Sequence, residues 1–105
     1  MSFLHSVQFL AALDNSNIQW HSHALMRMLE RGISRRSVME VLRCGKAIEE
    51  YPSDHPYPST LVLGYSDELP LHVVVAFDSE HKTIFIVTAY RPDLKHFKDD
   101  YQTRR

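Results

Sequence analysis

The chain contains 105 residues, 44% of them hydrophobic and 24% charged, which is enough for one domain whose core needs no disulfide or metal support. Its formal net charge of −1 excludes the strongly basic class of domains that holds nucleic acid by bulk electrostatic attraction, although arginines gathered in the first half allow one basic face. The single cysteine, Cys44, excludes an internal disulfide and favours a reduced, cytoplasmic setting, and no apolar run reaches the roughly 18 residues that span a membrane.

The first part of the chain favours helices. The apolar spacing of residues 3–13 is typical of a short amphipathic helix, and the alternation over residues 18–20 is typical of a short strand. The next segment predicts a helix with Met28 and Leu29 on its apolar face and Gly32 just past its end.

Ser34 is a suitable N-cap for a further helix, which Gly45 ends. The short link between the two helices predicts a tight helical hairpin.

The second half favours strands. Runs rich in β-branched and aromatic residues predict strands at residues 47–51, 60–65, 71–77 and 83–90, with hairpin-length connections between the last three. Residues 71–77 are almost continuously apolar and are expected at the centre of the sheet. The predicted fold is α+β, with N-terminal helices forming a hairpin on one face of a four- to five-stranded antiparallel sheet.

The predicted second helix carries the first candidate site. His23 and Arg27 lie one turn apart on its polar flank, and Arg31 follows one turn later. They form either a solvated helix flank or a general acid/base beside a fixed cation, the pairing that phosphodiester chemistry requires.

The strands carry the second group of candidates. His72 interrupts an apolar strand, as either a hydrogen-bonded core residue or a catalytic group. Thr88 and Tyr90 share one face of the last strand, either as packing partners or to position a phosphate or a stacked base. Glu49 is expected either to face solvent or to form an ion pair with Arg27.

Two further features are ambiguous. Arg104 and Arg105 form a frayed tail unless the C-terminal segment packs across the sheet. His21 and His23 form an HxH pair, but there is no HExxH motif and no cysteine pair, so we expect neither a metal nor a cofactor.

Several segments together resemble a known family. HALMRMLERGIS, VLRCGKAIEEYPSDHPYPSTLVLGY, PLHVVVAF and TAYRPDLKHF resemble domain of unknown function 4258, a family of small bacterial proteins. The resemblance covers residues 18–105 and leaves residues 1–17 as an N-terminal helical extension. That family is similar in turn to RelE-type toxins, which share the barnase, EndoU, colicin and RelE fold.

The resemblance implies metal-independent cleavage of RNA and an antitoxin-like protein partner. His23 or His72 would act as base and acid, and Tyr90 or Thr88 would orient the phosphate. Arg27, as a further catalytic residue, and Arg105 would hold the phosphate. Beside these, Arg31 and Glu49 are candidate substrate-binding residues from their own positions.

The enzyme hypothesis expects His23, Arg27, His72 and Tyr90 to converge around one open cleft. The alternative is a non-catalytic module that binds nucleic acid or protein in the same groove. Apolar residues of the N-terminal segment also allow a homodimer; they are Phe3, Leu4, Val7 and Leu10.

Overall fold

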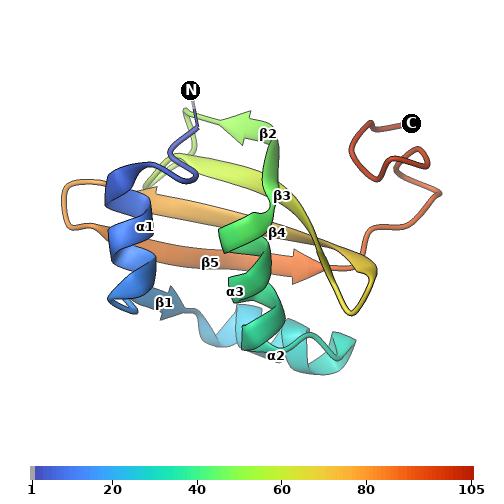
Figure 1. Cartoon of the computed structure of the whole chain (residues 1–105), viewed down its shortest axis with the longest axis horizontal. Coiled ribbons are helices and arrows are strands. Elements are labelled where there is room, and N and C mark those ends of the chain that lie inside the picture. The colour runs from blue at the N-terminus through green and yellow to red at the C-terminus, as the bar shows by residue number, and fades with distance from the viewer. Residues whose placement is uncertain (1) are drawn as a thin grey trace.

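The computed structural model describes residues 2–105, and within them three helices cover one face of a five-stranded sheet (Figure 1). The helices are α1 (Val7–Asp14), α2 (Ser22–Arg31) and α3 (Arg35–Cys44). The strands are β1 (Ile18–Trp20), β2 (Lys46–Tyr51), β3 (Ser59–Ser66), β4 (Leu69–Asp78) and β5 (Thr83–Tyr90). None of the helices in residues 2–105 has the length and hydropathy needed to cross a membrane.

Local capping chemistry sets the helix ends. Gly32 adopts a left-handed conformation with φ of 68° and ends α2, while the Ser34 side chain accepts the Ser37 N–H at 3.0 Å and begins α3. Both predicted ends are therefore confirmed. The first helix begins at Val7 rather than residue 3, because Ser6 caps it by accepting the Phe9 N–H at 3.2 Å.

The sheet has the strand order β1-β5-β4-β3-β2, so β4 is central as predicted. Strands β2 to β5 form an antiparallel meander, but β1 pairs parallel with β5, with Ile18 opposite Ile84. The sheet is therefore mixed, and the expectation of an antiparallel sheet was wrong at this edge. Two helices and three strands separate β1 from β5 along the chain, so no hairpin fixes the direction of β1.

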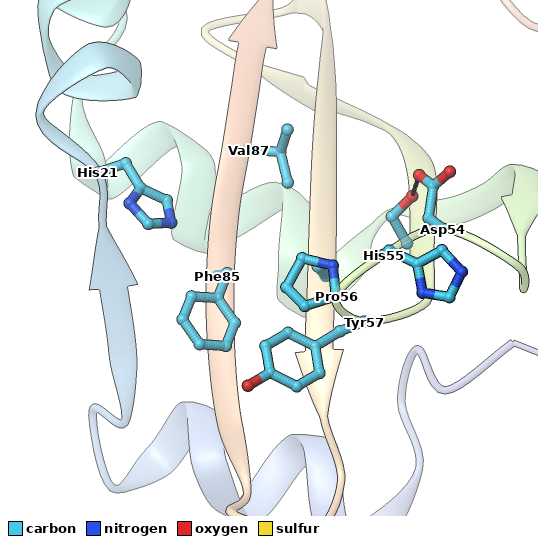
Figure 2. Close-up of a pocket in the computed structure, with 9 residues that line it drawn as sticks. His21, Asp54, His55, Pro56, Tyr57, Phe85 and Val87 are labelled. Atoms are coloured by element: carbon cyan, nitrogen blue, oxygen red, sulfur yellow. Dashed lines mark hydrogen bonds between the residues drawn. The ribbon is translucent and has the colours of Figure 1, made fainter.

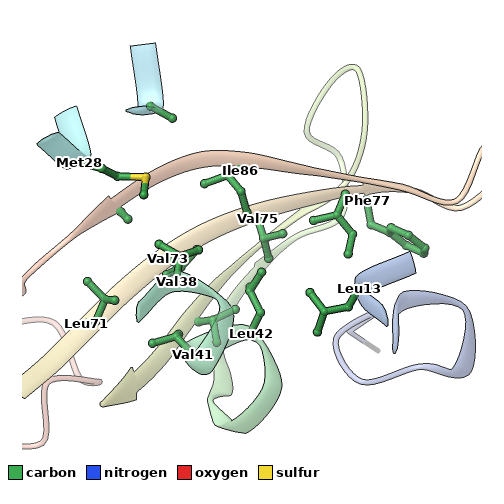
Figure 3. Packing of buried hydrophobic residues seen from close by; sticks show 14 of the residues in the cluster. Leu13, Met28, Val38, Val41, Leu42, Leu71, Val73, Val75, Phe77 and Ile86 are labelled. Atoms are coloured by element: carbon green, nitrogen blue, oxygen red, sulfur yellow. The ribbon is translucent and has the colours of Figure 1, made fainter. Parts of the chain in front are cut away.

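The hydrophobic core lies between the helices and one face of the sheet (Figure 3). Val73 and Val75 of β4 face α3, and Leu13 of α1 is buried in the same cluster. Helix α1 thus shares the core of the domain. Leu29, expected on the apolar face of α2, is 83% exposed. At about 100° per residue it lies some 140° around the helix from the buried Ala24.

The opposite face of the sheet, which we call the open face, carries the side chains that alternate with the core. Two β-bulges shape it. In β5 the register passes from Val75 opposite Ile86 to Val74 opposite Thr88, which leaves Val87 unpaired in the ladder and turns it, with Thr88, away from the core. A second register shift in β2 precedes Glu49.

Candidate functional site

A groove of about 450 Å³ lies between α2, β5 and the loop that joins β2 to β3. We call it the histidine groove. Its lining combines imidazoles, guanidiniums and one hydroxyl, supplied by His21, His23, Arg27, Arg31, His55 and Thr88.

Helix α2 positions the first pair. Ala24 and Met28 are buried against the sheet, so His23 and Arg27, four residues apart, lie on the exposed flank that borders the groove. Arg27 Nε donates to His23 Nε2 at 3.3 Å, and Arg27 Nη1 donates to Glu30 Oε2 at 3.3 Å. Because a guanidinium only donates, Nε2 of His23 is the acceptor, which is the unprotonated state that a general base requires.

Arg31 connects α2 to the end of β5. Its Nη1 donates to the Ala89 carbonyl at 2.9 Å, next to the bulge that turns Thr88 into the groove. The hydrogen bond fixes the guanidinium beside Thr88 while most of its donors remain available to a ligand.

A second hollow of about 470 Å³ continues the groove along the open face, because His21, His55 and Val87 line both (Figure 2). We call it the aromatic hollow. Three nearly parallel rings form its floor: His21 and Phe85 have centroids 5.9 Å apart, and Tyr57 and Phe85 5.1 Å apart. Its polar lining includes Asp54 and Ser59, and Ser59 Oγ donates to Asp54 Oδ2 at 2.5 Å.

The covered cluster is a separate polar assembly at the far end of β5, formed by Glu49, Tyr51, His72, Tyr90 and Arg104. His72 is fully buried. Its Nε2 lies 2.7 Å from the Tyr101 carbonyl and its Nδ1 lies 3.2 Å from the Tyr90 hydroxyl. The carbonyl only accepts, so Nε2 carries the proton and Tyr90 donates to Nδ1. Burial lowers the pKa of His72 and raises that of Tyr90, so both stay neutral near pH 7.

An ion pair closes the covered cluster. Arg104 Nε and Nη2 donate to the two carboxylate oxygens of Glu49 at 2.7 and 3.0 Å, and the Tyr51 hydroxyl donates to the same carboxylate. The Arg104 hydrogen bonds lower the pKa of Glu49. Arg104 also stands 5.0 Å above the ring of Phe97, which packs edge-on against His72 at 4.7 Å. The C-terminal segment therefore buries His72, while the Arg104 side chain stays partly exposed at the edge of the cluster.

Comparison with known proteins places the chain in a family. The family model described as Domain of unknown function (DUF4258) matches residues 20–91, well over half of the chain. The chain belongs to the DUF4258 family. No curated protein and no solved structure matches it.

The DUF4258 match includes the whole histidine groove but only part of the covered cluster. It runs from the end of β1 to just past β5 and contains every residue of the histidine groove named above. Tyr101 and Arg104, which close the covered cluster, lie beyond the match.

The structure brings some predicted residues together and separates others. His23, Arg27, Arg31 and Thr88 meet in the groove, whereas His72, Tyr90 and Glu49 lie in the covered cluster. The four expected catalytic residues therefore do not share one cleft, although Thr88 and Tyr90 are only two residues apart on β5. Glu49 pairs with Arg104 rather than Arg27.

Arg105 lies in neither cluster. Its Nε donates to the Phe97 carbonyl at 3.0 Å, so it anchors the C-terminal segment. It is Arg104, and not Arg105, that reaches the sheet, where it binds Glu49 of β2. Sequence reasoning also missed His55, Tyr57 and Phe85. The first two stand in a proline-rich segment that predicts only a loop. The one available signal was that two ring side chains, His55 and Tyr57, stand close together in that loop.

Proposed function

We propose that this protein is a metal-independent endoribonuclease whose reaction takes place in the histidine groove. One observation carries the proposal: an exposed imidazole, His23, is hydrogen-bonded to a guanidinium in a groove that also holds Arg31, His55 and Thr88. General acid/base groups beside fixed cations are what cleavage at an RNA phosphate requires. The likeness of the family to RelE-type toxins, suggested by the sequence motifs, supports the same reaction.

The residues divide the reaction as follows. When substrate binds, the Arg27 guanidinium turns from His23 to the phosphate. The freed His23 Nε2 then takes the proton of the ribose 2′-hydroxyl, and the 2′ oxygen attacks phosphorus. The bond to the 5′ oxygen breaks, and His55 donates the proton that this oxygen needs to leave. The products are a 2′,3′-cyclic phosphate and a 5′-hydroxyl. Arg27 and Arg31 stabilise the negative charge that develops on the phosphorane, and Thr88 orients a phosphate oxygen.

The covered cluster has a supporting part in this proposal. Both ring nitrogens of His72 are occupied and the side chain is buried, so it holds Tyr90 and the end of β5 in place. Thr88 and the Ala89 carbonyl that binds Arg31 belong to that same stretch of β5. The cluster therefore acts on the groove through the backbone.

The test is cleavage of a mixed pool of labelled RNA oligonucleotides in EDTA. We expect the wild type to cut, and His23→Ala and Arg27→Ala to lose activity by about 100-fold or more, because a positioned acid or base contributes at least that much. Arg36→Ala, whose side chain is 90% exposed on α3, is the matched control and keeps full activity.

Identical purification of all four proteins separates true cleavage from contaminating nuclease. A wild type that binds RNA without cutting it would contradict the enzyme and favour the non-catalytic binding module. Equal activity in all four proteins would assign the cleavage to a contaminant.

A further inference from the structure

The proposed reaction leaves the aromatic hollow unused. It is continuous with the histidine groove, has a similar volume of about 470 Å³, and is predominantly apolar in its walls (Figure 2). A hollow joined to a cationic groove by shared histidines is suited to a ligand with a flat apolar part next to an anionic part.

Strand pairing and the β2–β3 loop bring three aromatic rings together on the floor of the hollow. Phe85 of β5 pairs across the strands with Ala76 of β4, whose small side chain leaves room above the sheet. Tyr57 reaches over from the β2–β3 loop and lies within 12° of parallel to Phe85, and His21 lies within 16° on the β1 side. The nearby Asp78 carboxylate raises the pKa of the Tyr57 phenol.

We propose that the aromatic hollow is a subsite for one unpaired nucleobase, adjacent to the phosphate held in the histidine groove. The inference rests on the proposed function, and it names the substrate class as single-stranded RNA. Aromatic side chains beside a cationic groove bind single strands because every base presents a π-face to stack, whereas a paired base is not available to them.

Asp54 adds a preference among bases. The Ser59 hydroxyl takes one lone pair of Oδ2, so Oδ1 and the second lone pair of Oδ2 can accept from a ligand. A carboxylate accepts N–H donors, and guanine presents two adjacent donors on its Watson–Crick edge whereas uracil presents one. We therefore expect the subsite to bind guanine more tightly than uracil.

The test measures binding alone, with short 2′-O-methyl oligonucleotides that cannot be cleaved. Fluorescence anisotropy is recorded for the wild type, Phe85→Leu and Tyr57→Leu, with Tyr65→Leu as the control because Tyr65 is 57% exposed on β3 outside both hollows. We expect affinity to fall about tenfold in the first two variants and to stay unchanged in the control. Equal affinity in all four proteins overturns the subsite.

A second comparison guards against variants that weaken binding by misfolding. For the wild type, an oligonucleotide with one abasic position should bind about tenfold more weakly than the intact oligonucleotide. For Phe85→Leu, the abasic and intact oligonucleotides should bind with equal affinity. An abasic penalty that persists in Phe85→Leu overturns the assignment of the ring. A wild type that binds uracil as tightly as guanine overturns the assignment of Asp54.

Because no step of this test depends on cleavage, the two proposals fail separately. Loss of affinity in Phe85→Leu together with an inactive wild type retains the nucleobase subsite and removes the nuclease. Cleavage of unstructured RNA with unchanged affinity in Phe85→Leu and Tyr57→Leu retains the nuclease and removes the subsite.

Discussion

His23 and His72 stand on the same domain in opposite surroundings. His23 is exposed, receives one hydrogen bond from Arg27 and borders an open groove, whereas His72 is buried with both ring nitrogens bonded to protein. A general base needs a nitrogen that substrate can reach, and a buried polar group needs every nitrogen satisfied. The contrast shows that access of substrate to an imidazole, more than its presence in a strand or helix, identifies a candidate catalytic residue.

The histidine groove and the covered cluster are also built from different segments of the chain. The histidine groove is built by α2, β5 and a loop, all within residues matched by the DUF4258 family. The covered cluster depends on the C-terminal segment, through Phe97, the Tyr101 carbonyl and Arg104. Substitutions in the groove should therefore change activity without stability, and substitutions in the covered cluster should change stability first.

The largest effect is expected at His55, the proposed acid. His55→Ala should reduce RNA cleavage by about 100-fold or more without changing the urea midpoint of unfolding, since the side chain is exposed. The control is His96→Ala, an exposed histidine in the C-terminal segment. A variant that keeps full cleavage would remove His55 from the reaction and leave the 5′ oxygen without its acid.

A large stability effect is expected at His72. Replacement by Leu leaves the Tyr101 carbonyl and the Tyr90 hydroxyl without their partner, at a cost of about 2–3 kcal/mol in the free energy of unfolding. Urea denaturation measures that change. A His72→Leu protein with wild-type stability and no cleavage would give His72 the catalytic role that its burial argues against.

Arg104 should show a smaller effect of the same kind. Arg104→Ala removes two hydrogen bonds to Glu49 from a partly exposed site and should lower stability by about 1 kcal/mol. Hydrogen exchange should rise at the amides of the C-terminal segment while α2 stays protected. Unchanged exchange in residues 97–105 would mean that the ion pair does not fasten the segment.

The smallest effect expected is on pH dependence. Burial lowers the pKa of His72 below its ordinary value of 6.5, opposed by the Tyr101 hydrogen bond and by Glu49 and reinforced by Arg104. Between about pH 7 and pH 5 the unfolded chain binds a proton that the folded chain refuses, so acidification destabilises the fold.

Unfolding of wild type and His72→Leu at several pH values measures this effect. The wild type should lose more stability on acidification than the variant. Glu49, whose pKa is lowered, retains its contribution until the pH falls below the ordinary carboxyl value of 4.5, so it does not enter this window. Equal slopes for the two proteins would contradict the assignment.

Local signals in the sequence predicted much of the fold. Gly32 and Ser34 fix helix ends through their own backbone geometry and hydrogen bonds, and the apolar run of β4 predicts its central place. Their chemistry acts within a few residues, so the printed sequence is sufficient. The same is true of His23 and Arg27, because helical spacing alone makes them neighbours.

Features set by distant pairings could not be predicted. The parallel direction of β1 depends on β5, far along the chain, and the bond between Glu49 and Arg104 joins residues 55 positions apart. Tyr57 meets Phe85 only because the loop folds back over the sheet. Sequence reasoning therefore found the members of both clusters on α2 and the strands, but not which of them face one another.

The measurement that most directly separates the two regions is an NMR titration of the wild type with a 2′-O-methyl RNA oligonucleotide. We expect the resonances of His23, Arg27, His55 and Thr88 to shift with added RNA, while those of His72 and Tyr101 stay in place. Shifts confined to His72, Tyr90 and the C-terminal segment would contradict the histidine groove as the RNA site and assign the working surface to the covered cluster.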